Sequence, residues 1–573
     1  MNTGKDGITR REFVATSATA GLMLGLLPLL HGCARLGSET LFVNGAIYID
    51  ADHRVTNLLI RNGIVAGINV DPARHPDAQQ IDLGGAAVYP GFNDSHVHLI
   101  TVAVAGSILV PTPEGMDDPL AIAEVVGAQC VGKEPGTPVM GHGFKLDNYN
   151  AWSLADLAEI NRLTGDQCPV MIADQLGHSS IVNSVAMRMS GIDDDTPDPP
   201  GGVIVRDKTT GQATGMLRET AGAIVGNAAI FSRVPDDAVK PEAIQLLRQW
   251  ASMGYTSIVD LMGGPMGRTM KPELCRELDR EGLLPLRINY AFTFFSLDDM
   301  LDYEQAGHDS PRVHFAGLKL FVDGAAGQGG AWTSWVNTQG NHGLHAVCTN
   351  DEDHGEQYNI YRILEQSEAL GLDMHYHVGG DLAIDAVLSA IEAAQQKNGQ
   401  LRGKHTLYHL GLITDEQIAS MSALGESVIA GVQPSLHWEF QKEETAFYYG
   451  EHAQGSYPYR KMRDAGVTLA FSTDFASNIP RLCWPTEIMR IALTGAGDPD
   501  ANPPLTMRDL IEGFTVGGYA TTREARVGRL YPGYKADLVI YEKDLYDVAP
   551  EALSMYNPSV LSTWVGGRPI LPI

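Results

Sequence analysis

Segments with the composition of buried strands alternate with stretches of helical periodicity along most of this 573-residue chain. The first is the apolar run 86–89, which leads into residues 90–98. Seven more follow at 255–261, 286–291, 313–322, 372–378, 404–410, 427–432 and 468–474. Repeated strand–helix units pair their strands in parallel, and eight of them fit a closed barrel. We therefore predict an α/β fold with a (β/α)8 TIM-like barrel over 86–524.

Metal-ligand side chains stand at the ends of these segments, where a barrel of this kind holds its active site. His96 and His98 follow the first segment, and residues two apart on a strand share one face. Lys319 lies inside an apolar segment, where an unpaired ammonium is costly to bury, so it needs a partner or a modification. The later segments end in further residues of this kind: His375, His377, His405, His409 and Asp474. Imidazoles and carboxylates that converge in this way predict a site for divalent metal ions.

Several of these residues also have a simpler interpretation. Lys319 could pair with Asp323, which alternation places on the same face of the segment. Asp474 could cap a helix after the last segment. Alternation alone does not decide which member of each histidine pair binds metal, since both members share a face: His375 with His377, and His405 with His409.

Four further patterns carry a resemblance to a known family. They are GFNDSHVH at 91–98, GHS at 177–179 with NS at 183–184, PGGVIVRD at 200–207, and GRLYPGYKADLVI at 528–540. Together they resemble the amidohydrolase superfamily, specifically amidohydrolase family 3, the group that includes N-substituted formamide deformylase-like enzymes. The similarity extends from about Thr40 to the C-terminus.

The resemblance implies a centre with two divalent metal ions. It assigns His96 and His98 to the more buried ion, and His377 and His409 to a second ion. Lys319, carboxylated by carbon dioxide, would bridge the two ions as an anionic oxygen ligand. We therefore expect two zinc ions bridged by carboxylated Lys319 as the cofactor.

The resemblance also implies that Asp474 contacts metal and is the catalytic residue. Coordination lowers the pKa of water from about 15.7 to about 7, which provides a metal-bound hydroxide near neutral pH. This hydroxide would attack a substrate carbonyl, and Asp474 would pass the proton to the leaving nitrogen. The predicted function is a metal-dependent amidohydrolase that cleaves amide-type C–N bonds of N-acyl or N-formyl amines. Two alternatives stay open: an ester or cyclic amide hydrolase with the same centre, and a non-catalytic surface lipoprotein that binds small molecules.

Three further residues are predicted to bind substrate. His178 lies between the first two strand segments and could bind the substrate carbonyl or stabilise its own loop by hydrogen bonding. His437 and Trp438 follow the seventh segment and could line the mouth of the pocket or serve in packing. Arg218 and Glu219 also resemble a family segment, although a plain salt bridge explains them equally well.

The two ends of the chain predict a second domain. Short alternating runs with Asn-Gly turn signals occupy 40–85, and 525–573 has a similar pattern. By resemblance to the family, these segments meet as a composite β-sandwich beside the barrel. The stretch between the first two strands is too long for an ordinary barrel loop, so we expect an insertion subdomain at about 111–206.

The first 33 residues predict export. Residues 9–14, TRREFV, match a twin-arginine signal, and the apolar stretch 18–30 is too short for a comfortable membrane span. The residues LHGC that end at Cys33 resemble a lipobox, so we expect a periplasmic or cell-surface lipoprotein anchored to the membrane by acylated Cys33. The alternative is an ordinary cleaved signal with Cys33 nearby by chance.

The formal charge of -28 makes this chain a poor binder of nucleic acid. The expected partner is a small-molecule amide substrate, and a homodimer stays open. Apart from Cys33, the cysteines lack paired spacing, so we expect free and mostly buried thiols. A disulfide between Cys130 and Cys168 is an open alternative.

Overall fold

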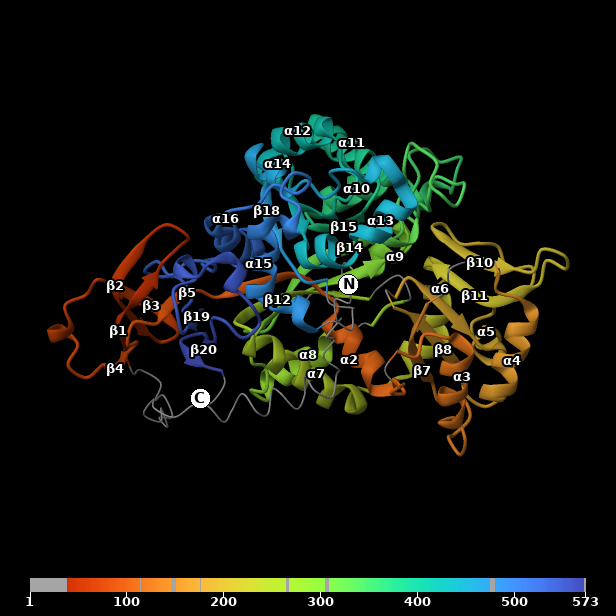
Figure 1. Cartoon of the computed structure of the whole chain (residues 1–573), viewed down its shortest axis with the longest axis horizontal. Helices are drawn as coiled ribbons and strands as arrows, with labels where there is room; N and C mark the ends of the chain where they lie inside the picture. The colour runs from red at the N-terminus through yellow and green to blue at the C-terminus, as the bar shows by residue number, and fades with distance from the viewer. Residues whose placement is uncertain are drawn as a thin grey trace, which may run out of the picture.

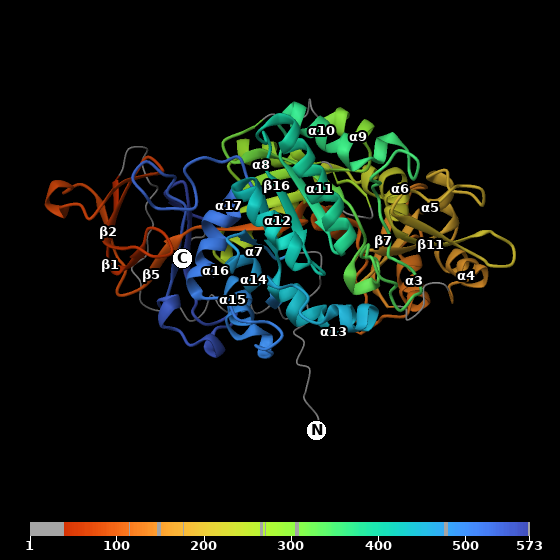
Figure 2. The ribbon, with the colours of Figure 1, turned by 90° about the horizontal axis from the view of Figure 1, so that it is seen from above.

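The computed structural model of the protein describes residues 39–570, apart from 114, 146–150, 176, 264–266, 270, 304–308 and 475–479. The predicted export signal and Cys33 lie outside the described residues. Three sheets follow one another along the long axis of the molecule (Figure 1). A sheet built from both chain ends lies at one extreme, a barrel occupies the centre, and a third sheet lies at the other extreme. The view from above has the same order (Figure 2).

The central barrel consists of eight parallel strands in sequence order. Its strands are β6 (Phe92–Val97), β12 (Tyr255–Met262), β13 (Arg287–Phe294), β14 (Val313–Phe321), β15 (Met374–Val378), β16 (His405–His409), β17 (Val428–Val432) and β18 (Thr468–Phe471). Each strand pairs in parallel with its neighbours in this order. This nearly closed barrel confirms the predicted TIM-like (β/α)8 fold class.

Side-chain and backbone hydrogen bonds draw the last strand toward the first. The Asp474 amide donates to the His96 carbonyl at 2.9 Å, and Ser95 Oγ donates to the Phe471 carbonyl at 3.0 Å. Asp94 accepts from the Thr473 amide at 2.9 Å. The residues that follow β18 are therefore held against the end of β6.

Helices separate consecutive strands and cover the barrel from outside. The main ones are α7 (Asp236–Ser252), α8 (Pro272–Arg280), α10 (Ile360–Leu370), α11 (Asp381–Asn398), α12 (Asp415–Leu424) and α15 (Pro485–Thr494). Their ends carry the expected signals: Thr414 forms a capping box at the start of α12, and Gly371 ends α10 in the left-handed conformation. Because helices cover the outside and side chains fill the inside, strands such as β12 and β13 are buried throughout.

The first barrel strand differs from the predicted one. The apolar run 86–89 belongs to β5 (Ala87–Pro90), which pairs with β1 (Glu39–Tyr48) and β19 (Leu538–Tyr541) in the sheet of the chain ends. The barrel begins only at β6, after Gly91. A Cβ atom at Gly91 would lie 2.1 Å from Thr256 Oγ1, so only glycine lets the chain pass this close to β12 as it changes sheets.

Residues from both ends of the chain form one sheet. Besides β1, β5 and β19, it contains β2 (Arg54–Arg61), β3 (Ile64–Ile68), β4 (Gln79–Asp82), β20 (Val560–Val565) and β21 (Arg568–Pro569). Phe42 and Trp564, from opposite chain ends, meet edge to face with ring centroids 5.1 Å apart. A buried ion pair joins this sheet to the barrel, with Arg287 Nε 2.6 Å from Asp537 Oδ2.

The chain between β6 and β12 carries a five-stranded sheet of its own. Its order is β10-β11-β9-β8-β7, and helices α3 (Pro119–Ala128) and α4 (Leu154–Thr164) pack beside it. The strands are β7 (Val139–Phe144), β8 (Val170–Asp174), β9 (Ser179–Val182), β10 (Gly202–Arg206) and β11 (Ala213–Glu219). The sheet therefore runs on to Glu219, past the predicted end at 206. The Asp207 carboxylate accepts from the Thr209 and Thr210 amides in the turn after β10. This turn lets β11 pair with β10, so the sheet continues beyond residue 206.

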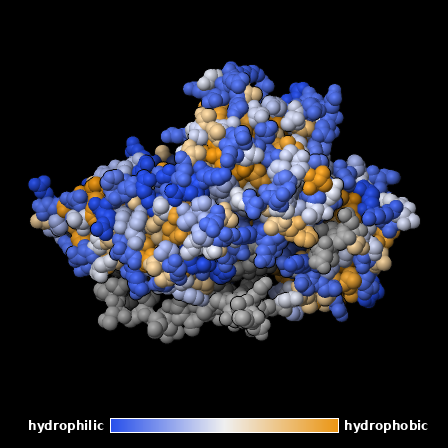
Figure 3. All heavy atoms as spheres, turned by 45° about the horizontal axis from the view of Figure 1, so that its top comes forward, coloured by the Kyte–Doolittle hydropathy of each residue, from blue (hydrophilic) through white to orange (hydrophobic). Residues whose placement is uncertain are grey.

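The face of the molecule drawn in Figure 3 is mainly polar, and the described cysteines are free thiols, as expected from the sequence. Hydrophilic residues predominate on the face drawn in Figure 3, and hydrophobic ones are scattered in small groups. Among the described residues, no helix has the length and apolar character needed to cross a membrane. The five described cysteines, which include Cys130 and Cys168, are free and buried, so the disulfide that stayed open is not formed.

Candidate metal centre

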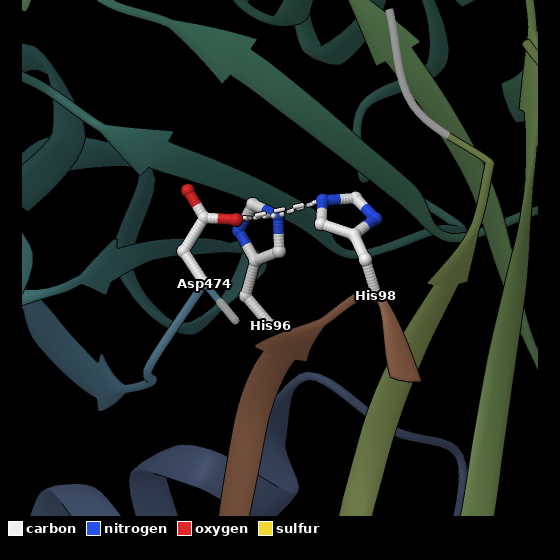
Figure 4. A group of neighbouring side chains, drawn as sticks. All are labelled: His96, His98 and Asp474. Atoms are coloured by element: carbon white, nitrogen blue, oxygen red, sulfur yellow. Dashed lines mark hydrogen bonds and ion pairs between the residues drawn. The ribbon is translucent and has the colours of Figure 1, made fainter. Parts of the chain in front are cut away.

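His96, His98 and Asp474 converge where β6 and β18 end (Figure 4). The two imidazole Nε2 atoms lie 3.2 Å apart. Asp474 Oδ1 lies 3.3 Å from His96 Nε2 and 3.4 Å from His98 Nε2. Two ligands held about 2.0–2.1 Å from a tetrahedral zinc ion are about 3.3 Å apart, so the three donor atoms fit neighbouring ligands of one ion.

Local structure positions two of these three side chains, His98 and Asp474. His98 Nδ1 donates to the Leu261 carbonyl at 3.0 Å, which leaves His98 Nε2 facing Asp474. Asp474 has a φ of 48°, an unusual backbone conformation for aspartate that directs its carboxylate to the imidazoles. The carboxylate therefore faces two histidines, which the interpretation as a helix cap does not explain.

The charge states in this cluster suit a cation. Burial lowers the pKa of His96 well below its usual value, so its imidazole is neutral and has a free lone pair. Burial alone would raise the pKa of Asp474, but its close contact with His96 and a hydrogen bond with His98 hold it well below its usual range. An ionised carboxylate beside a neutral imidazole is a pair of donors that a zinc-like ion prefers.

Lys319 is fully buried inside β14. Its Nζ atom has no hydrogen-bond partner among the described residues, and it lies 4.8 Å from the Phe321 ring centroid and 5.1 Å from that of Tyr408. Burial lowers the pKa of Lys319 to about 7, so much of the amine is uncharged near neutral pH. An uncharged amine is the form that reacts with carbon dioxide, so this lysine fits carboxylation.

The ion pair between Lys319 and Asp323, one of the interpretations left open, is not formed among the described residues. Asp323 is engaged elsewhere: it accepts from the amides of Gly379, Gly380 and Trp332 at 2.8–3.1 Å. Its Oδ1 atom also accepts from His377 Nδ1 at 3.1 Å. These contacts direct the Asp323 carboxylate to His377 and to the loop after β15.

His377 and His409 lie together beside the first cluster. Their ring centroids are 4.4 Å apart, and His409 Nδ1 lies 3.9 Å from Asp474 Oδ2. Asp323 occupies Nδ1 of His377, which leaves its Nε2 atom to bind a ligand. Burial lowers the pKa of His409 well below its usual value, so this imidazole is neutral as well.

The other member of each histidine pair is occupied by structural contacts. His375 has Tyr408 Oη 3.1 Å from Nδ1 and the Ala316 carbonyl 3.2 Å from Nε2. His405 has Tyr376 Oη 3.2 Å from Nδ1 and Glu368 Oε1 3.2 Å from Nε2. With both ring nitrogens engaged, neither side chain is placed to bind metal. Depth along the barrel, which alternation does not report, separates the two members of each pair.

His178 reaches the cluster from the insertion. Its ring centroid lies 5.8 Å from that of His377, and its Nδ1 atom donates to Glu219 Oε2 at 2.7 Å. Glu219 has a φ of 49°, and its Oε1 atom accepts from the Ala325 amide at 3.2 Å. Burial alone would raise the pKa of Glu219, but attraction to His178 holds it below its usual value. The sequence placed Glu219 in a segment that resembles the family and left a plain salt bridge open as its role. It gave no signal that His178, 41 residues away, is its partner.

His437 and Trp438 lie on the other side of the histidine cluster. His437 Nε2 is 3.4 Å from His409 Nδ1, and its ring stacks on Tyr457 with a centroid separation of 4.0 Å. Trp438 is buried, and its indole N–H donates to the Tyr457 carbonyl at 3.3 Å. His437 therefore borders the cluster, whereas Trp438 packs behind it.

Comparison with known proteins places this geometry in a family. The model of the amidohydrolase family matches residues 79–571, which is most of the chain. The chain belongs to the amidohydrolase family. It is a hydrolase of carbon–nitrogen bonds other than peptide bonds, and the family implies a divalent metal ion.

Similar proteins span nearly the whole of this amidohydrolase. It is 27% identical to an N-substituted formamide deformylase of Arthrobacter pascens, over 89% of this chain and 94% of that protein. A putative amidohydrolase of Bacillus subtilis, YtcJ, is 22% identical over 92% of this chain and 99% of its own length. A metal-dependent hydrolase from Pyrococcus horikoshii, described as uncharacterized, aligns with a TM-score of 0.67 at 21% identity, over 90% of this chain and 100% of its own.

Proposed function

We propose that this amidohydrolase cleaves the amide C–N bond of small N-acyl or N-formyl amines. The observation that carries the proposal is the convergence of His96, His98 and Asp474 at 3.2–3.4 Å beside buried Lys319, whose amine has no hydrogen-bond partner in the described part of the chain. The N-formyl class is drawn from the similarity to the formamide deformylase.

The donor set fits two zinc ions. His96, His98 and Asp474 would hold the more buried ion, and His377 and His409 the second. Carboxylated Lys319 would supply the bridging anionic oxygens. When bound, such ions polarise a carbonyl and lower the pKa of water from about 15.7 to about 7.

Asp474 would move the proton in the reaction. Its pKa lies well below the usual range, so it is ionised near neutral pH and would offer its oxygens to a proton of the attacking water, whose acidity a bound ion would raise. Its two oxygens face different histidines, Oδ1 toward His96 and Oδ2 toward His409 at 3.9 Å. A carboxylate between the two groups of ligands can then donate that proton to the leaving nitrogen.

Side chains around the centre would bind the substrate. His178 would contact the substrate carbonyl through Nε2, since Glu219 engages its Nδ1 atom. His437 would border the leaving-group side, with its ring held against Tyr457. Trp438 would contribute to substrate binding indirectly. Its indole N–H donates to the Tyr457 carbonyl, so it would support the residue on which the His437 ring stacks.

The test combines zinc content with hydrolysis of N-formyl and N-acyl amines. Purified protein expressed with bicarbonate and zinc is compared with Lys319→Ala and with Lys404→Ala, a barrel lysine whose Nζ instead donates to the Ala520 carbonyl at 3.0 Å. We expect wild type and Lys404→Ala to bind two catalytic zinc ions and to release the amine. Lys319→Ala should lose the catalytic zinc ions and the release of amine. If Lys319→Ala keeps full zinc content and full activity, the proposal that Lys319 bridges the two ions is refuted. Zinc-replete protein that cleaves none of these amides would refute the substrate class.

We also propose that the protein is exported by the twin-arginine route and anchored by acylated Cys33 as a periplasmic or cell-surface lipoprotein. The motif at 9–14 and the lipobox-like sequence support this proposal. Cys33→Ala is expected to move the protein from the membrane fraction to the soluble one. An unchanged distribution would favour an ordinary cleaved signal.

A further inference from the structure

A second group of metal-ligand side chains lies in the long loop after β14. His345, Asp353 and His354 each offer one donor atom, and these atoms all lie within 4.8 Å of one another. His345 Nδ1 and His354 Nε2 are 3.2 Å apart, the separation also found between the Nε2 atoms of His96 and His98. This separation again fits two imidazoles that bind one tetrahedral ion.

The loop presents these donors from well-anchored positions. The His345 backbone forms a bridge with Asp323, and its ring stacks on Trp332 with centroids 4.4 Å apart and planes at 21°. At the far side of the loop, the Ile360 amide donates to the Cys348 carbonyl at 2.9 Å. Two of the three side chains are half-buried, and only Asp353 is exposed.

A metal-free interpretation accounts for only part of this arrangement. His345 Nδ1–H can donate to the Val347 carbonyl at 2.9 Å and share that proton with His354 Nε2. This shared hydrogen bond leaves Asp353 with only a loose contact, its Oδ1 atom lying 3.9 Å from His354 Nδ1, which is beyond hydrogen-bond distance. A cation would use all three groups, since one donor atom of each lies within 4.8 Å of the others, with the His345 proton moved from Nδ1 to Nε2 when Nδ1 becomes a ligand.

We propose that His345, Asp353 and His354 form a further site for a divalent ion of the zinc class, separate from the candidate catalytic centre. Imidazole-rich sites with one carboxylate suit zinc and its neighbours better than calcium or magnesium. The ion would tie the far part of the loop to His345. Because the His345 backbone pairs with Asp323, which holds His377, an occupied site would also steady the side of the barrel that carries this histidine.

The experiment measures zinc at equilibrium in full-length processed protein. Metal-stripped wild type, His354→Ala and Asp353→Ala are dialysed against the same buffered free zinc and analysed for zinc per chain. The matched control is His342→Ala, a histidine of the same loop that contacts the Thr333 carbonyl and lies outside the group. Cobalt(II) absorption under the same conditions gives a spectroscopic count of bound imidazole-rich sites.

We expect wild type and His342→Ala to bind one zinc ion more than His354→Ala, and Asp353→Ala to need at least about tenfold more free zinc to fill the site. Zinc should also raise the thermal midpoint less in His354→Ala than in the wild type. Equal zinc content in all four proteins would overturn the proposal. All four retain the candidate catalytic centre, so the difference does not depend on the proposed function. If His354→Ala fails to fold, Asp353→Ala tests the proposal through its zinc content, because Asp353 is exposed and its substitution should leave the fold intact.

Discussion

At the scale of single residues, function depends on which nitrogen or oxygen of a side chain is left free. Asp323 occupies Nδ1 of His377, and the Leu261 carbonyl occupies Nδ1 of His98. Both imidazoles are thereby oriented with Nε2 available to a ligand. Second contacts of this kind fix the tautomer and direction of ligating histidines.

Glu219 is expected to position His178 in the same way. Glu219→Gln keeps an oxygen that can accept from Nδ1 and should lower kcat/KM modestly, whereas Glu219→Ala should lower it about 10–100-fold. Steady-state kinetics with an N-formyl amine check this, with circular dichroism to monitor folding. Glu365→Ala, which removes an exposed partner of Lys397, is the control. Equal kinetics for Glu219→Ala and wild type would refute the positioning role.

Lys319 gives a second test at this scale. Lys319→Ala should lower kcat/KM by about 100-fold or more, because it removes a proposed ligand and leaves a cavity. A small carboxylate such as formate or acetate should restore part of the activity by supplying the missing oxygens. Lys319→Met fills the cavity and should not respond. Rescue of both variants, or of neither, would contradict a bridging carboxylated lysine.

At the scale of elements, the passage from the sheet of the chain ends to the barrel controls where His96 and His98 lie. Pro90 ends β5, and the Gly91 amide donates to the Asp537 carbonyl at 2.9 Å before β6 begins. The histidines follow within a few residues of this junction. A change in its backbone is therefore expected to displace the candidate ligands.

Gly91→Ala is expected to destabilise the protein by about 1–3 kcal/mol, because its Cβ would lie 2.1 Å from Thr256 Oγ1. The control is Gly106→Ala in α2 (Leu99–Ile108), where the nearest atom lies 3.6 Å from the new Cβ and helix propensity favours alanine. Thermal midpoints and zinc content are measured for both variants. A midpoint for Gly91→Ala equal to that of the wild type would show that the junction can relax at little cost.

At the scale of the whole molecule, the barrel brings together residues from distant parts of the chain. Glu219 of the insertion contacts His178 and the Ala325 amide after β14. Arg287 of β13 pairs with Asp537 near the other end of the sequence. The three sheets are therefore coupled through buried polar contacts as well as apolar packing.

Asp537→Asn should destabilise the protein, because it leaves the buried Arg287 guanidinium partly unpaired. Loss of one partner of a buried pair costs about 3–5 kcal/mol, and Glu524, 3.7 Å from Arg287 Nε, should reduce this cost. Lys461→Ala breaks an exposed pair with Asp415 and should cost about 1 kcal/mol or less. Thermal unfolding compares the two variants; equal midpoints would show that the buried pair adds little to the attachment of the end sheet.

The sequence by itself determined the fold class and the residue types of the candidate ligands. Strand-like segments alternating with helical ones specify parallel strands, and the residues at their ends lie on one face of the barrel. Periodicity reports which face a side chain takes but not its depth, so it did not separate His377 from His375 or His409 from His405. The sequence pattern also assigned 86–89 to the barrel, because an apolar run does not indicate which strand it pairs with.

Only the tertiary structure decided which hydrogen-bond partners orient the candidate ligands. It turned Asp323 toward His377 instead of Lys319, and it joined Glu219 to His178 across 41 residues. The physical reason is that such contacts depend on strand order and on the relative position of neighbouring strands along the barrel. Both arise from the packing of the whole chain, and no local stretch of sequence encodes them.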